Sequence, residues 1–181
     1  MILLDTSSQS EENPPPPELR YVPLPVDTVP TDPDDLELSR GRPRDSRCVC
    51  ATREGIKFVS VDRRHYSNFG VGHARMLRWE HTFRITTWSL REDDDGVYTW
   101  SKDATMSEDE LCAAVDSASR RLIPHHLTPE FPVVDMENPD AVCFRLNKDE
   151  YGSEEPAWMI EVHMKKKVLL AATAYSKKKN V

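Results

Sequence analysis

One segment limits the choice of fold more than any other: residues 83–106, FRITTWSLREDDDGVYTWSKDATM. It holds two runs of apolar and β-branched residues, which are typical of strands, and Asp95-Gly96 lies between them. Asp-Gly supplies the positive φ that tight hairpin turns need. The segment therefore predicts a β-hairpin with Trp88 and Trp100 packed in the sheet. Residues 93–95 lack the further oxygen ligands of a calcium loop, so a turn is favoured there.

Six further strand-like runs extend this pattern, because such runs, separated by turn residues, follow one another from Cys48 onward. The predicted strands are Cys48–Thr52, Ile56–Val61, Thr82–Leu90, Val97–Lys102, Phe131–Asp135, Ala141–Asn147, Trp158–Met164 and Val168–Tyr175. Trp158–Met164 alternates apolar and polar residues, which predicts a half-buried strand with His163 toward solvent. Val168–Tyr175 is continuously apolar and fits a strand covered on both faces, with a short buried helix as the alternative. We therefore predict a mainly β fold of antiparallel sheets.

One short helix is predicted after the fourth strand. Ser107 and Glu110 form an S-x-x-E capping box, in which each side chain binds the backbone N–H of the other residue, before the apolar run 111–115. The segment between Asp62 and His81 is predicted to be a long loop, and long loops in compact domains are commonly functional or disordered.

The N-terminal quarter differs from the rest in composition. Residues 1–46 hold ten acidic and four basic side chains and are rich in proline, so we expect an acidic, largely disordered segment. Within it, Leu19–Pro25 is apolar and bounded by proline, and is expected to lie on the domain as a short extended strand or polyproline segment. The mainly β domain is predicted to span residues 47–176, followed by a basic tail at 177–181.

Charge and composition exclude several classes of function. Residues 47–181 hold twenty-one acidic and twenty basic side chains, so they lack the positive field that nucleic-acid binding requires. No stretch is long and apolar enough to span a bilayer, and no signal peptide is recognisable, which favours an intracellular, cytoplasmic or nuclear protein. Cys48 and Cys50 are expected to point to the same face of a strand as buried free thiols, because no second pair follows at zinc spacing.

Catalytic signatures are absent as well. The sequence has no G-x-S-x-G, H-E-x-x-H or G-x-x-x-x-G-K-[ST] motif, so we predict no catalytic residue, cofactor site or metal site. His125 and His126 follow Pro124 and are interpreted as loop histidines. A hydrolase that uses one of them with Ser117 or Ser119 is the enzyme alternative.

Six segments, in this order along the chain, carry a resemblance to a known family. They are Leu19–Pro25, Gly55–Val61, Ile85–Leu90, Trp100–Asp103, Asp109–Leu111 and Phe131–Phe144. Together they resemble the plant family called domain of unknown function 1618, which is abundant in grasses. Its members look like distant relatives of F-box-associated and Kelch-like β-propellers, whose blades are four-stranded antiparallel sheets. The resemblance implies about two blades here, Cys48–Lys102 and Phe131–Tyr175.

The same resemblance implies a function only in outline. We expect a non-catalytic protein-interaction module, in the manner of ubiquitin-ligase substrate recruitment, with an unknown protein partner. The four arginines of the predicted loop are the expected partner-binding residues: Arg63, Arg64, Arg75 and Arg78. Because a propeller needs about four blades or more, the chain is also read as a portion of a longer family member. A truncated product without a retained role is the remaining alternative.

Overall fold

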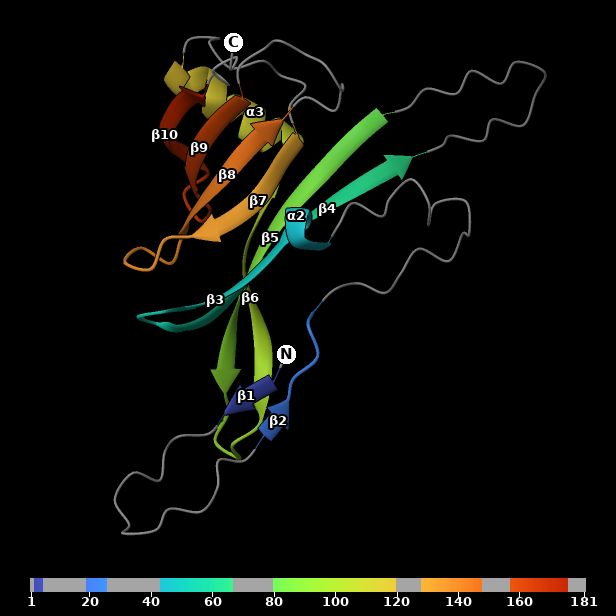
Figure 1. Ribbon diagram of the computed structural model, residues 1–181, viewed down its shortest axis with the longest axis vertical. Coiled ribbons are helices and arrows are strands. Elements are labelled where there is room, and N and C mark those ends of the chain that lie inside the picture. Colours follow the sequence, from blue (N-terminus) through green and yellow to red (C-terminus); the bar gives the residue numbers. More distant parts are fainter. Residues whose placement is uncertain are drawn as a thin grey trace, which may run out of the picture.

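The computed structural model describes residues 2–4, 19–25, 43–66, 80–119, 128–147 and 157–175. Within these ranges the chain forms two four-stranded antiparallel sheets, a two-stranded ribbon and two helical segments (Figure 1). The mainly β fold expected from the sequence is therefore confirmed.

The first sheet is a meander in which each strand pairs with the next along the chain. Its strands are β3 (Arg47–Thr52), β4 (Gly55–Tyr66), β5 (Glu80–Glu92) and β6 (Tyr98–Ser107). The turn between β5 and β6 is the predicted hairpin turn: Gly96 has a φ of 75°, and the Asp93 carboxylate accepts hydrogen bonds from the backbone of Asp95 (3.1 Å) and Val97 (2.7 Å). The Asp93 side chain thus stabilises the turn itself.

The second sheet repeats this plan. It consists of β7 (Thr128–Val134), β8 (Ala141–Asn147), β9 (Ala157–His163) and β10 (Val168–Tyr175), in the order β10-β9-β8-β7. All eight strands predicted from the sequence are therefore present. The turn at Lys165–Lys167 is exposed, and His163 is only half exposed, with its Nδ1 accepting a hydrogen bond from the backbone of Lys166.

The prediction that β10 is covered on both faces is wrong. β10 is an edge strand, and seven of its eight residues are exposed. A continuous apolar run reports the hydrophobicity of a segment but not its place in the sheet. In a meander the last strand lies at the edge, whatever its composition.

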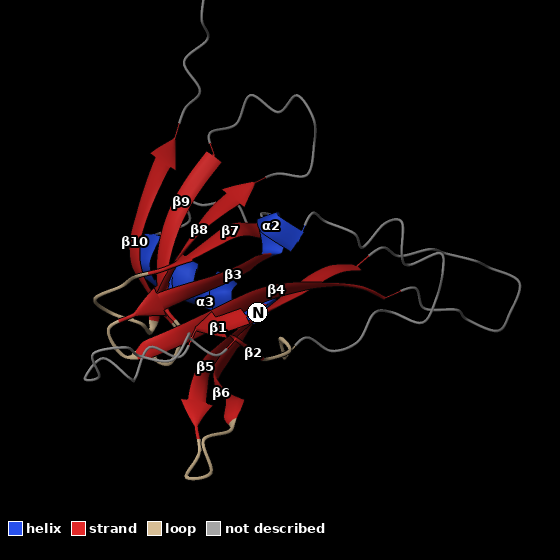
Figure 2. Ribbon diagram, turned by 60° about the horizontal axis from the view of Figure 1, so that its bottom comes forward, coloured by secondary structure: helices blue, strands red, loops and turns tan. Residues whose placement is uncertain are grey.

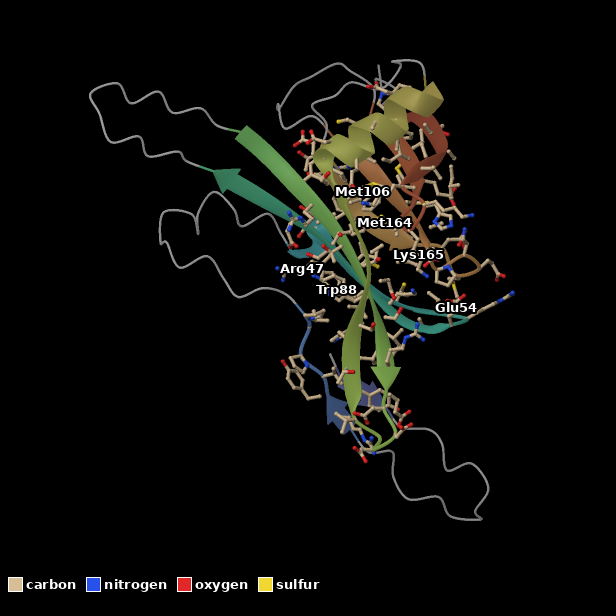
Figure 3. All side chains as sticks on the ribbon, turned by 180° about the vertical axis from the view of Figure 1, so that it is seen from behind. Arg47, Glu54, Trp88, Met106, Met164 and Lys165 are labelled. Atoms are coloured by element: carbon tan, nitrogen blue, oxygen red, sulfur yellow. The ribbon has the colours of Figure 1, made fainter. Side chains whose placement is uncertain are left out.

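The core lies between the two sheets, where their inner faces meet (Figure 2). Val59 and Ile85 of the first sheet and Phe144 and Ile160 of the second are at most 1% exposed. Met106 and Met164 belong to the same cluster and lie between the sheets (Figure 3). Packing of this kind, at about 1.5–3 kcal/mol for each fully buried large side chain, is the main source of stability in the fold.

Helix α3 (Glu108–Ser119) contributes Leu111 and Val115 to this core. It begins at the predicted capping box: the backbone N–H of Ser107 donates to Glu110 Oε2 (2.9 Å), and the N–H of Glu110 donates to Ser107 Oγ (3.3 Å). Two backbone donors that helix formation would leave unpaired are thereby satisfied.

Residues 19–25 of the N-terminal segment lie against the outer face of the first sheet. The short strands β1 (Ile2–Leu4) and β2 (Leu19–Tyr21) pair with each other, and α2 (Pro43–Ser46) is a single helical turn. The Trp100 indole donates a 2.9 Å hydrogen bond to the carbonyl of Pro23, and Val22 is buried. Leu19–Pro25 thus contacts the first sheet through Pro23. The expected disorder of residues 5–18 and 26–42 lies outside the described residues.

The two tryptophans of the hairpin are placed as predicted. On that outer face Trp88 is 7% exposed and stacks on Phe58 with ring centroids 5.1 Å apart, and Trp100 lies 5.9 Å from the same ring. Aromatic pairs at these distances contribute about 0.5–1.5 kcal/mol beyond the area that they bury. Both tryptophans therefore serve packing, and Trp100 also holds the N-terminal segment.

Candidate functional site between the sheets

The arginines expected to bind a partner are not all on a loop. β4 extends to Tyr66 and β5 begins at Glu80, so the predicted loop from Asp62 to His81 is shorter than expected. Arg63 and Arg64 lie on β4, paired in register with β5, and their side chains lie outside the described part of the structure. The loop starts too early in the prediction because a strand rich in charged residues carries little hydrophobic signal.

The remaining predicted candidates lie in parts of the chain that the structure does not describe. Arg75, Arg78, His125 and His126 are outside the described residues. Ser117 and Ser119 lie at the C-terminal end of α3, and their side chains are likewise outside the described part. How these predicted residues lie relative to one another is therefore outside the described part of the structure.

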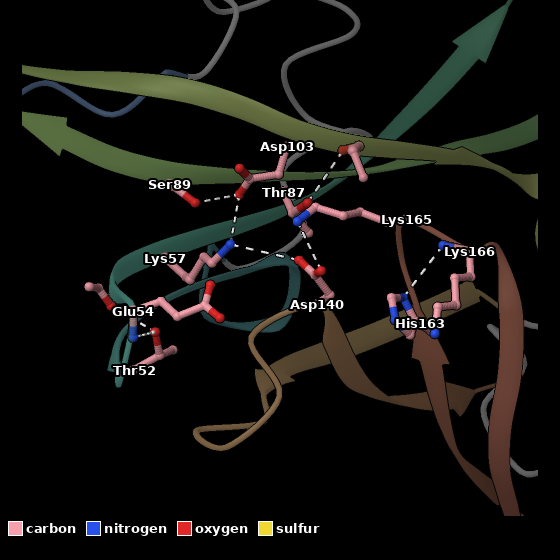
Figure 4. A network of polar contacts seen from close by, with 12 residues as sticks. Thr52, Glu54, Lys57, Thr87, Ser89, Asp103, Asp140, His163, Lys165 and Lys166 are labelled. Carbon is pink, nitrogen blue, oxygen red and sulfur yellow. Dashed lines mark hydrogen bonds and ion pairs between the residues drawn. The ribbon is translucent and has the colours of Figure 1, made fainter.

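Sequence reasoning missed a buried polar cluster, which the structure places on the inner face of the first sheet (Figure 4). Lys57 of β4 is 4% exposed, and its Nζ lies 3.0 Å from Asp103 Oδ2. Ser89 of β5 donates a 2.6 Å hydrogen bond to the same carboxylate oxygen. One carboxylate therefore binds both an ammonium and a hydroxyl in the interior.

A β-bulge in β6 supplies the carboxylate. Thr87 of β5 pairs with Ala104 and Trp88 pairs with Lys102, so the register skips Asp103. The bulge gives β6 one residue more than β5, which is how sheets re-aim a side chain. Aspartate is disfavoured inside regular strands, and the bulge accommodates it.

The cluster continues to the second sheet through Asp140, in the turn between β7 and β8. Its Oδ1 lies 3.9 Å from Lys57 Nζ, and its Oδ2 lies 2.9 Å from Lys165 Nζ. The hydrogen bond to Asp140 raises the pKa of the Lys165 ammonium, so this lysine stays charged at neutral pH. Two cations and two carboxylates thus link the sheets.

The geometry suits an ion-pair link between the sheets. An ammonium as deeply buried as that of Lys57 is costly without a partner, and Asp103 and Asp140 supply two. Ser89 directs its hydroxyl hydrogen at a carboxylate that the Lys57 ammonium already neutralises. The cluster therefore holds the interior polar groups paired and fixes how the two sheets meet.

Two thiols lie next to this cluster. Cys48 and Cys50 of β3 pair in register with Val59 and Lys57 of β4, so all four side chains point to the inner face. Both cysteines are free, as predicted, but they are half-buried because β3 is the edge strand of its sheet. The hydrogen bond from Cys50 lowers the pKa of the Cys48 thiol to about 7, and the same bond raises the pKa of Cys50.

A third candidate surface is the exposed edge at β10. Leu170 is 46% exposed and Tyr175 is 61% exposed, in a strand without charged residues. Among the described strands, only β9 pairs with β10. An apolar edge of this length is an unusual surface, because edges are commonly blunted by charges or proline.

In the described part of the chain, no group of three or more histidine, cysteine, aspartate or glutamate side chains is placed to hold a metal ion. No helix among the described residues is long and apolar enough to cross a membrane.

Comparison with known proteins gives one result. Neither the curated proteins nor the solved structures contain a significant match to the chain. The sequence model of a family described as a protein of unknown function (DUF1618) matches residues 1–143. This match includes the whole first sheet, helix α3 and strand β7, and it ends inside β8. Since it covers well over half of the sequence, the chain belongs to the DUF1618 family.

Proposed function

We propose that this chain is a protein-interaction module that binds an extended segment of a partner protein along β10. The observation that carries the proposal is the exposure of an uncharged, apolar strand at the edge of the second sheet. Partner strands add to such edges through backbone hydrogen bonds, and side-chain contacts then select the sequence. The two four-stranded meanders also support a relation to blade-forming interaction domains.

The chemistry of β10 suits strand addition. The sequence VLLAATAY contains no proline, glycine or charge that would blunt the edge. Leu170 forms a bulge, because Leu169 and Ala171 pair with consecutive residues of β9. Leu170 is therefore the residue of β10 that β9 does not pair, and its side chain is available to a ligand.

Charge at both ends of the strand indicates what the partner looks like. Lys165–Lys167 precede β10, and the sequence places Lys177–Lys179 after it. Lys165 contacts Asp140, and Lys167 contacts Glu110. Acidic residues of the ligand would bind the same ammonium groups beside these carboxylates. The expected ligand is an apolar extended segment flanked by aspartate or glutamate, because complementary charge favours encounter and register.

A peptide-display selection against the full-length protein tests the proposal. We expect the selected peptides to be apolar, extended and acidic at their ends. Titration calorimetry with one synthetic selected peptide should then show about tenfold weaker binding to Leu170→Lys, which corresponds to a loss of about 1.4 kcal/mol. A selection that returns no such peptide contradicts the proposal, as does unchanged affinity in this variant.

Two comparisons make the result specific. Val133→Lys is the matched control, because Val133 is 57% exposed on the opposite edge strand, β7; its affinity should stay within about twofold. A variant that carries glutamate in place of four arginines tests the surface expected from the sequence: Arg63, Arg64, Arg75 and Arg78. Loss of peptide binding in this variant alone would move the site away from β10. A dimer that Leu170→Lys dissociates in light scattering would instead identify a second copy of the chain as the occupant.

A further inference from the structure

Aromatic side chains form a row on the outer face of the first sheet. Tyr98 and Trp100 are two apart on β6, so they share a face. The Trp100 ring lies 5.9 Å from the ring of Phe58, on which Trp88 stacks. Surfaces lined by aromatic rings bind proline-rich segments in several kinds of recognition domain, because such segments are already extended and lose little entropy on binding. The outer face therefore has the side chains that recognition of proline needs.

The chain's own residues 19–25 lie on this face, beside the hairpin of β5 and β6 (Figure 1). The Trp100 indole donates its hydrogen bond to the carbonyl of Pro23, and Val22 is buried. Pro23 and Pro25 keep the residues before them in extended conformations. In the described part of the chain β2 pairs only with β1, so no backbone ladder joins this segment to strands β3–β6. The segment is thus seated as a peptide ligand would be, through side-chain contacts with the sheet.

Arg20 anchors the other end of the segment. Its Nη1 donates a 3.0 Å hydrogen bond to the carbonyl of Gly96, and its guanidinium lies 5.9 Å from the centroid of the Tyr98 ring, within the range of a cation–π contact. Residues 92–95 of the same hairpin are glutamate and three aspartates, and all four are exposed. A basic side chain three positions before a proline therefore meets complementary charge on this sheet.

We propose that the outer face of the first sheet is a binding site for proline-rich segments of a partner protein, with residues 19–25 as its intramolecular competitor. A ligand with the pattern Arg-x-x-Pro-x-Pro takes over the contacts that Arg20 and Pro23 make with the hairpin. The site lies on the first sheet, whereas β10 belongs to the second. This inference therefore stands apart from the function proposed for β10.

Tethering decides which occupant the site takes. A tethered segment is present at an effective concentration on the order of millimolar, which exceeds ordinary protein concentrations. A second copy of the chain offers only the identical segment, so it is outcompeted. A partner protein has to bind more tightly, and its apparent affinity is lowered by the fraction of sites that the tethered segment fills.

Fluorescence anisotropy of a labelled peptide with the full-length protein tests the proposal. The probe has the sequence of residues 18–26 with Tyr21→Ala, a change at an exposed position that gives the probe a mass unlike that of the chain's own segment. The variant Arg20→Glu/Val22→Asp weakens the competitor, so it should bind the probe at least about tenfold more tightly than the wild-type protein does. Equal affinities, or no binding to the folded variant, overturn the proposal.

The wild-type protein supplies a second test that needs no variant. The probe is added above the effective concentration of the tethered segment, so it should displace residues 19–25 from the sheet. The amides of these residues should then exchange at least about fivefold faster in hydrogen-exchange mass spectrometry. Unchanged exchange under this condition overturns the proposal.

Further substitutions locate the probe. Added to Arg20→Glu/Val22→Asp, Trp100→Phe should weaken probe binding about fivefold, because it removes the indole donor. Leu170→Lys in the same background should leave the affinity within about twofold; the reverse pattern would place the probe on β10 and overturn the proposal. Tyr21→Ser is the matched control for the segment, because this exposed change should leave the wild-type affinity unaltered. A wild-type dimer that Arg20→Glu/Val22→Asp dissociates in light scattering would make a second copy the occupant and also overturn the proposal.

Discussion

Lys57 Nζ and Asp103 Oδ2 lie 3.0 Å apart, although their strands, β4 and β6, are on opposite sides of β5. The Lys57 side chain can reach Asp103 across β5 because Ser89, which pairs in register with Lys57, has a small side chain. Its hydroxyl also binds the shared oxygen. Three strands of the first sheet are therefore linked by one carboxylate, and Asp140 extends the link to the second sheet.

Removing the Lys57 ammonium should destabilise the protein strongly. Lys57→Met leaves the buried Asp103 carboxylate without its cation, and breaking a buried ion pair from one side costs about 3–5 kcal/mol. Urea unfolding followed by tryptophan fluorescence measures the change. The exposed Lys166→Met is the control and should shift the free energy of unfolding by no more than about 0.5 kcal/mol.

The same cluster should tolerate complete replacement better than partial loss. The variant Lys57→Met/Ser89→Ala/Asp103→Leu removes the ammonium, the hydroxyl and one carboxylate together. Asp140 keeps its ion pair with Lys165, so no buried charge is left without a counter-charge. Apolar replacements of buried ion pairs are often neutral or stabilising. We expect this variant to recover most of the stability lost in Lys57→Met. A triple variant less stable than Lys57→Met would show that the cluster contributes net stability.

The charge of Glu110 should stabilise helix α3 in a pH-dependent manner. Its contact with Lys167 and its bond to the Ser107 backbone lower the pKa of Glu110 below the ordinary value of 4.5. The contribution of the Glu110 charge to the free energy of unfolding is fully present above the ordinary pKa of 4.5, and it is lost as the pH falls through the lowered pKa. Glu110→Gln keeps a capping side chain, so at pH 7 it should cost only about 0.2–1 kcal/mol. Urea unfolding at pH 7 and at acidic pH should show this difference shrinking; a difference that grows on acidification contradicts the assignment.

The bond between Trp100 and Pro23 should hold the N-terminal segment on the sheet. Trp100→Phe removes a donor worth about 1 kcal/mol, so amides of residues 19–25 should exchange about fivefold faster in hydrogen-exchange mass spectrometry. Tyr98→Phe is the comparison, because it deletes a hydroxyl bond to Glu92 but leaves the ring next to Arg20. Equal acceleration in both variants would assign the effect to the hairpin as a whole.

The turn at Gly96 should resist a side chain for conformational reasons. Its φ of 75° lies in the left-handed region, and an added Cβ would meet only Glu92 Oε1, at an ordinary 3.8 Å. Gly96→Ala should therefore cost about 1–2 kcal/mol from the backbone alone. Gly96→Asn should cost less, because asparagine tolerates this conformation. Thermal unfolding of the two variants compares them directly, and equal losses would contradict the backbone explanation.

The elements of the fold could be predicted because their signals are local. Strand-like runs, the turn at Asp95-Gly96 and the capping box at Ser107 each depend on a few neighbouring residues, and the structure has them all. The location of a strand in its sheet depends on pairing between distant segments. For this reason the apolar run of β10 predicts an interior strand, although the strand lies at an edge.

The polar cluster could not be predicted for a related reason. Asp103 follows Lys102 in a polar stretch, so the predicted fourth strand ends before it. Only the register between β5 and β6 reveals the bulge, and only the meeting of the two sheets brings Asp140 to Lys57. The spacing of Cys48 and Cys50 did predict a shared face, but their contact with β7 required the fold.

The bulge at Asp103 also decides to which face of the sheet each later side chain of β6 points. Side chains alternate between faces with a period of two, so one extra residue exchanges the faces of all later positions. Ala104 and Met106 pair with the inward residues Thr87 and Ile85, whereas an uninterrupted strand would turn Thr105 inward. Substitution and deletion at this position are therefore different experiments: replacing Asp103 changes the charge of the interior, whereas deleting it would remove the bulge and keep Ala104 and Met106 opposite Thr87 and Ile85.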